Sequence, residues 1–224
     1  MKNNRVIING LLALSFILFI IALFLVFIYV PTEKTMGIVQ RIFYLMVPMA
    51  WLALFSFIII FIASILYLKS RNSKWDIIAT SAAELGIVFT TLTLITGSSW
   101  ARPIWGVWWT WEPRLTATLV LWLIYFAYFM VRSFTTEESR GATFAAVVGI
   151  VGFIDVPIIG MATTLWRGLH PGAIIFQGGL APSMLLTLIV NLAAFTAFYI
   201  FLLTQRISIK NAELKILILK KSGT

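Results

Sequence analysis

The chain contains 224 residues, of which 61% are hydrophobic and only 11% charged, and its formal net charge is +9. A soluble domain carries about 25% charged residues, so this chain lacks the polar surface that would cover a soluble core. The composition therefore excludes soluble globular, disordered and collagen-like proteins, and it indicates an integral membrane protein.

Six apolar runs follow one another along the chain, and each is long enough to cross about 30 Å of hydrocarbon as a helix. We expect the spans at about 6–30, 46–68, 77–97, 114–132, 142–161 and 182–203. The first run is uncharged from Val6 to Thr32. It exceeds the h-region of about 7–15 residues in a cleavable signal peptide, so we expect it to remain as an anchor. The predicted fold is all-α, with six transmembrane helices in a single domain over residues 1–224.

The basic residues are distributed unequally between the two ends of the predicted spans. The end that holds both termini carries 12 of the 17 lysines and arginines, and the opposite end carries five. Because positive charge is enriched on cytoplasmic segments, both termini are predicted to be cytoplasmic, and no nucleic-acid partner is needed to explain the charge. All seven prolines then lie in or beside the outer loops, which indicates an extracytoplasmic site. The tail from Arg206 onward is expected to form a short basic helix on the inner membrane surface.

The predicted outer loop at residues 98–113 is rich in tryptophan. It holds five of the nine tryptophans of the chain, namely Trp100, Trp105, Trp108, Trp109 and Trp111. Tryptophan is common in aromatic belts at membrane surfaces, but a belt spreads its rings over many helix ends. A cluster in one loop favours a surface for a large, flat, apolar ligand.

Charged residues surround this loop. Arg102 and Arg114 flank the tryptophans, and Arg41 and Arg167 lie in neighbouring outer segments. Guanidinium groups either bind carboxylates of a planar ligand or extend to lipid headgroups. Glu112 directly follows the tryptophans, where it either pairs with an arginine or is an exposed acid without a role.

Haem is the common flat dicarboxylate, and its iron takes axial imidazole or thioether ligands. The single histidine, His170, lies in the last outer loop, and Met46 lies at the outer end of the second span. A lone histidine is often structural and a methionine in an apolar helix often only packs, so both readings stay open for each residue. The absence of cysteine excludes zinc–thiolate sites, iron–sulfur clusters and thiol catalysis.

Two acidic residues fall inside predicted spans. Asp155 lies in the outer third of the fifth span and Glu84 in the inner third of the third span. Acidic groups within the membrane are candidates for function. Asp155 is expected to lie below the tryptophans and to pair with an arginine, and Glu84 is expected to reach the inner interface.

The segment WGVWWTWEPRLT at 105–116 resembles the tryptophan-rich signature of the WWD haem-handling family of cytochrome c maturation. Two further segments, RIFYLMVP at 41–48 and the FIDVPII…LWRGLHPG stretch at 153–172, resemble its haem exporter C (CcmC) branch. His170 stands where that branch has its second histidine. Met46 replaces the first histidine, Glu112 stands where the signature has an aspartate and keeps its charge, and Pro113 stands where it has a small residue.

The resemblance implies a non-enzymatic, multi-pass protein of the inner or plasma membrane that binds haem b transiently at the outer face. His170 would be an axial ligand of the iron, with Met46 as a second. The implied partners are the haem chaperone CcmE, the ABC-type complex CcmA/CcmB, the small subunit CcmD and membrane lipid. The alternative is a cytochrome c synthase-type haem lyase of the related family, although such enzymes have longer chains and more histidines.

Overall fold

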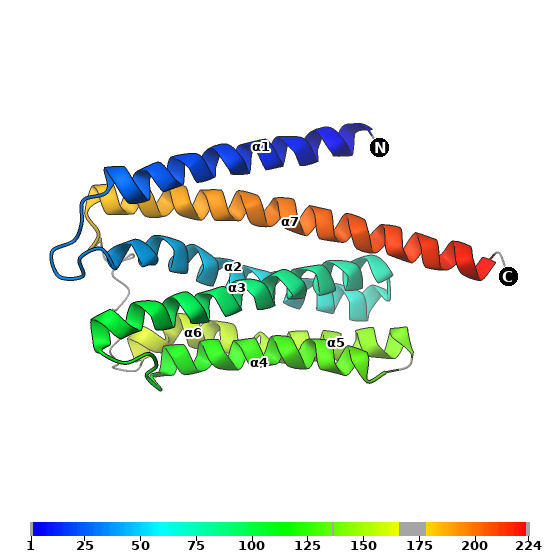
Figure 1. The fold of residues 1–224 in the computed structure, drawn as a ribbon. Coiled ribbons are helices and arrows are strands. Elements are labelled where there is room, and N and C mark those ends of the chain that lie inside the picture. The colour runs from blue at the N-terminus through cyan, green and yellow to red at the C-terminus, as the bar shows by residue number, and fades with distance from the viewer. Residues whose placement is uncertain (1, 136, 166–177, 223–224) are drawn as a thin grey trace.

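The computed structural model describes residues 2–135, 137–165 and 178–222, and in these ranges the chain is helical with no extended strand (Figure 1). In chain order the elements are α1 (Lys2–Phe24), the π-helical turn η1 (Leu25–Tyr29), α2 (Gln40–Ser70), α3 (Ser73–Trp105), α4 (Pro113–Ser133), α5 (Glu138–Gly152), α6 (Asp155–Leu165) and α7 (Pro182–Ser222). Six stretches of the described chain are long and apolar enough to cross a membrane, and α5 and α6 together make the fifth. The predicted all-α fold with six spans is confirmed.

The helices lie side by side in one elongated bundle. In Figure 1, α1 and α7 form one side, α4, α5 and α6 form the other, and α2 and α3 lie between them. Both termini lie at one end, as an even number of spans requires, and the α3–α4 connection lies at the opposite end. We call these the termini end and the loop end.

The centre of the bundle is held by tyrosines whose hydroxyl groups are paired. The Tyr125 hydroxyl donates to the backbone carbonyl of Ala53 at 2.7 Å, which joins α4 to α2. The hydroxyls of Ser56 and Tyr199 are hydrogen-bonded at 2.8 Å, which joins α2 to α7. The Tyr125 ring lies against α3 at Gly86, where a Cβ atom would stand 2.5 Å from its Cε1. This close approach requires glycine at position 86.

The helix α3 extends further toward the loop end than the sequence indicated. We expected a loop at 98–113, but residues 98–105 continue the helix and the non-helical connection is residues 106–112. Pro103 is tolerated near the helix end, where a missing N–H removes one hydrogen bond. The helix ends at Gly106, which adopts a φ of 78°, and its N–H donates to the Arg102 carbonyl at 3.0 Å.

The fifth span is divided into two helices. Its helical hydrogen bonds are interrupted at residues 153–154, between α5 and α6. Pro157 has no N–H with which to bond the Phe153 carbonyl, and that carbonyl instead accepts from the N–H of Val156 at 3.1 Å. The break places Asp155 at the first position of α6, inside the membrane-crossing stretch.

The C-terminal tail is not a separate surface helix, so that expectation was wrong. Residues 206–222 continue α7 as part of one helix of 41 residues. Arg206 and Lys210 both form ion pairs with Glu84 of α3, and the Lys210 Nζ lies 3.0 Å from its Oε1. These pairs join α7 to α3 at residues 206–210.

Replacing Gly86 with alanine is expected to lower the free energy of unfolding by about 1–3 kcal/mol, because the new methyl group overlaps the Tyr125 ring. Thermal unfolding of the detergent-solubilised protein, followed by circular dichroism, measures the effect. The control is Gly10→Ala in α1, where a Cβ has no neighbour within 4 Å. Equal melting temperatures for the two variants would contradict the prediction.

Candidate functional site

The loop end presents a segment that contains the clustered tryptophans. This tryptophan segment, residues 100–111, begins in the last turns of α3 and passes through the turn at Gly106 toward α4. The Arg102 guanidinium donates to the Gly106 carbonyl and closes this turn. Pro113 occupies the first turn of α4, where its missing N–H costs nothing, and so it fixes the start of that helix.

The five indoles of the segment differ in exposure and do not form one plane. Trp100 is buried and meets the Trp105 ring edge-on, with centroids 5.1 Å apart and an interplanar angle of 86°. Trp109 and Trp111 form a second nearly perpendicular pair, with centroids 6.0 Å apart. Trp108 and Trp111 are 62% and 76% exposed. The buried rings anchor the segment, and the exposed rings are free to contact a ligand.

Glu112 and Arg114 lie at the entry to α4. Glu112 is 9% exposed and its carbonyl accepts the Thr116 N–H at 3.0 Å. The Glu112 carboxylate interacts electrostatically with the half-buried guanidinium of Arg114. Of the two alternatives left open by the sequence, Glu112 is therefore a buried acid beside an arginine and not an exposed one.

Met46 lies in α2 at the loop end and faces the helix that carries the tryptophans. Its Sδ stands 3.8 Å from the position that a Cβ on Gly97 would occupy. Gly97 precedes Trp100 by about one helical turn. The thioether is thus close to the base of the tryptophan segment, a proximity that the sequence alone does not reveal.

Arg41 is turned toward η1 rather than toward the tryptophans. Its guanidinium carbon lies 5.5 Å from the centroid of the Phe27 ring, a cation–π contact. The preceding residue, Gln40, is 2% exposed and accepts the Glu33 N–H at 2.7 Å, so it ties the α1–α2 connection to α2. Hydrogen bonds from Thr35 and Met36 hold the pKa of Glu33 below its ordinary value.

Two of the predicted site residues are in a part of the chain for which no placement is described. His170 and Arg167 belong to residues 166–177, outside the described ranges. Their roles therefore remain predictions. The helices on either side, α6 and α7, both have an end at the loop end, where the tryptophan segment lies (Figure 1).

The two acids inside the spans have opposite surroundings. Glu84 is paired with Arg206 and Lys210. Asp155 is 8% exposed, and its Oδ2 is buried with no hydrogen-bond partner among the described residues. The expected pairing of Asp155 with an arginine is not found within that part of the chain.

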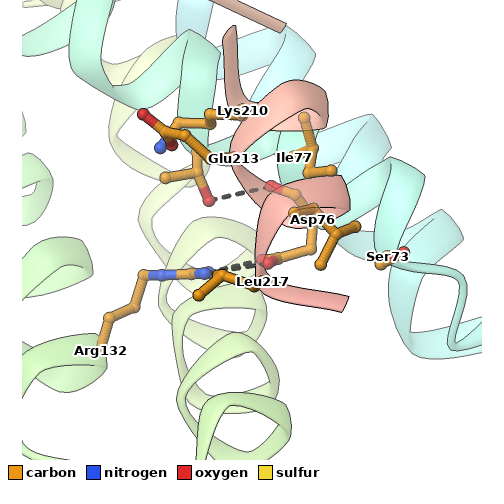
Figure 2. A pocket seen from close by; sticks show the side chains of 9 residues that line it. Ser73, Asp76, Ile77, Arg132, Lys210, Glu213 and Leu217 are labelled. Atoms are coloured by element: carbon orange, nitrogen blue, oxygen red, sulfur yellow. Dashed lines mark hydrogen bonds and ion pairs between the residues drawn. The ribbon is translucent and has the colours of Figure 1, made fainter. Parts of the chain in front are cut away.

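A small cavity of about 130 Å³ lies at the termini end, between α3, α4 and α7 (Figure 2). Its walls include Asp76, Arg132, Lys210 and Glu213. Figure 2 shows the Arg132 guanidinium directed at the Asp76 carboxylate, and the two oxygens accept at 2.5 and 2.9 Å. Asp76 and Arg132 pair with each other and Lys210 pairs with Glu84, so these charges join the helices that surround the cavity. It is remote from the tryptophans.

Reasoning from sequence missed two threonines beside the tryptophans. The side-chain oxygens of Thr110 and Thr116 are buried and, like Trp109 Nε1, have no hydrogen-bond partner among the residues described. A threonine hydroxyl in a helix usually bonds the carbonyl four residues earlier, as that of Thr118 does with Arg114 at 2.8 Å. No local pattern distinguishes Thr116 from Thr118.

Comparison with known proteins identifies relatives over most of the chain. The family described as Heme exporter protein C (CcmC) matches residues 1–219. A protein of Bradyrhizobium diazoefficiens named Heme exporter protein C is 38% identical over 175 residues, which is 77% of this chain and 66% of that relative. A Marchantia polymorpha protein named Putative cytochrome c biosynthesis ccmC-like mitochondrial protein is 32% identical over 182 residues, which is 79% of this chain and 77% of the Marchantia protein.

The match also extends to Escherichia coli. Its protein named Heme exporter protein C is 30% identical over 156 residues, 70% of this chain. The chain spans slightly less than two thirds of the length of the Bradyrhizobium and Escherichia relatives.

Glu84 is ion-paired and Asp155 has no partner among the described residues, so removing the charge of each is expected to affect stability differently. Glu84→Gln is expected to lower the free energy of unfolding by about 1–3 kcal/mol, because Arg206 and Lys210 lose a partly buried counter-charge. Asp155→Asn is expected to leave stability unchanged or raise it, because no ion pair with a described residue is lost. The melting temperatures of both variants measure these changes in stability. A marked fall in the melting temperature of Asp155→Asn would show that Asp155 binds a group outside the described residues.

Proposed function

The chain belongs to the Heme exporter protein C family, and on that basis we propose that it binds haem at its loop end and presents it for delivery. The proposed cargo is haem b, which is held transiently and passed on. The protein acts as a carrier subunit and not as a catalyst. It works in the maturation of cytochromes c, in accordance with the names of its relatives.

The observation that carries this proposal is the exposure of Trp108 and Trp111 on a short connection held in place by its buried neighbours. Two indoles that are 62% and 76% exposed offer wide apolar area at little entropic cost. The guanidinium of Arg114 lies in the same region and suits a carboxylate of the cargo. A planar molecule with an apolar face and acidic substituents matches both features.

We assign His170 to the haem iron and Met46 as the second axial ligand. The support for Met46 is its place against α3, about one turn before Trp100. A thioether paired with an imidazole raises the reduction potential of haem iron relative to two imidazoles. This ligand set would favour the ferrous state of the cargo.

The charge distribution supports an orientation for the proposed carrier. The termini end, which is rich in lysine and arginine, faces the cytoplasm of a cell with a plasma or inner membrane. The loop end then faces outward, where an extracytoplasmic haem chaperone of the CcmE type would collect the cargo. An ABC-type complex of CcmA and CcmB and the small subunit CcmD are the proposed membrane partners.

The experiment that tests the ligand assignment is the absorption spectrum of the purified, haem-loaded protein. His170→Ala is expected to weaken or shift the Soret band, and Met46→Ala to shift it while part of the haem is retained. Unchanged spectra in both variants would overturn the assignment. The protein expressed alone should not attach haem to a Cys-x-x-Cys-His reporter, and a thioether-linked product would favour the synthase alternative.

Removing the exposed indoles separates ligand contact from folding. The double variant Trp108→Ala/Trp111→Ala is expected to bind haem roughly tenfold more weakly or worse, with an unchanged melting temperature, because exposed rings contribute little to the packed core. Soret titration measures the affinity. Trp51→Ala is the matched control, because Trp51 is also exposed, at 43%, but lies on α2 outside the tryptophan segment. Equal loss in the control would contradict the prediction.

A further inference from the structure

We infer that Trp109, Thr110 and Thr116 form a carboxylate-binding site at the junction of the tryptophan segment and α4. The inference rests on the proposed function and extends it, because it assigns the residues that recognise the acidic edge of the flat cargo. It gives Trp109 the role of a hydrogen-bond donor, in contrast to the exposed indoles of Trp108 and Trp111.

The first step is that three buried side-chain groups all have no hydrogen-bond partner among the described residues. Trp109 Nε1, Thr110 Oγ1 and Thr116 Oγ1 are shielded from solvent, and none has a hydrogen-bond partner among the described residues. The three residues lie within eight positions of one another. They follow the turn at Gly106 and end in the first turns of α4.

The second step is the chemistry of these groups. An indole N–H donates only, and a threonine hydroxyl can donate, so the trio matches an acceptor. Burying such a group without a partner is unfavourable, and natural proteins rarely retain several together unless a ligand or water completes them. An anionic oxygen is the acceptor that forms the strongest bonds with them.

The third step is the local charge. The half-buried guanidinium of Arg114 lies between Thr110 and Thr116 in the chain and favours an anion. Glu112 is buried nearby, yet none of the three donors bonds its carboxylate. The donors therefore stay available for a carboxylate that comes from outside the chain.

Other buried groups without partners do not form a comparable set. Ser64 and Ser81 each have a buried hydroxyl without a hydrogen-bond partner, but they lie 17 positions apart in the sequence, on α2 and α3. Asp155 can only accept when ionised and would repel an anion. Within the described chain, three buried donors without partners fall within eight positions of one another only at this junction.

The test compares haem with haem dimethyl ester, in which both carboxylates are blocked, by Soret titration of the detergent-purified full-length protein. The wild type is expected to bind haem more tightly than the diester. Thr116→Val, which keeps the shape of the side chain but removes the hydroxyl, should weaken haem binding about tenfold and leave diester binding unchanged. Thr110→Val and Trp109→Phe should act in the same direction.

Thr118→Val is the matched control, because the Thr118 hydroxyl already bonds the carbonyl of Arg114 within α4. It should alter neither affinity, and Thr116→Ser should restore haem binding. Equal wild-type affinity for haem and its diester, or a Thr116→Val variant that weakens both or neither, would overturn the inference. A wild type that binds neither ligand would instead overturn the proposed function.

Discussion

The need to pair polar groups within hydrocarbon is the constraint on which this structure depends. A membrane interior offers no water to unpaired N–H and C=O groups, so spanning segments form helices that satisfy them internally. The same constraint acts on side chains where the helices meet. Tyr125 bonds the Ala53 carbonyl, and Tyr199 is hydrogen-bonded to Ser56. These contacts fix how α2, α4 and α7 pack, and Gly86 lets α3 approach the same tyrosine.

The two ends of the bundle satisfy this constraint differently. At the termini end, charged groups bind one another: Arg132 holds Asp76, and Arg206 and Lys210 hold Glu84. At the loop end, hydrogen-bond donors are buried without partners and two tryptophans are exposed. Among the described residues, the charged groups at the termini end thus have ionic partners, whereas the loop end combines buried donors without partners and exposed aromatic rings.

Departures from regular α-helix occur mainly toward the loop end. The π-helical turn η1 ends α1, Pro103 lies in the last turns of α3, and the fifth span breaks before Pro157. Each has a local cause in missing or displaced backbone hydrogen bonds. The break before Pro157 places the buried Asp155 at the first position of α6.

The sequence by itself determined the class of fold, the number of spans and the segment that carries the candidate site, because hydrophobic length and tryptophan spacing are local properties. It also placed Glu112 and Arg114 together, since they are two residues apart. Only the tertiary structure showed that Met46 faces Gly97, that Glu84 pairs with Arg206 and Lys210 of α7, and that Thr116 differs from Thr118. These relations join segments distant in the chain or depend on what covers one side of a helix. The packing of neighbouring helices decides them, and no local pattern encodes that packing.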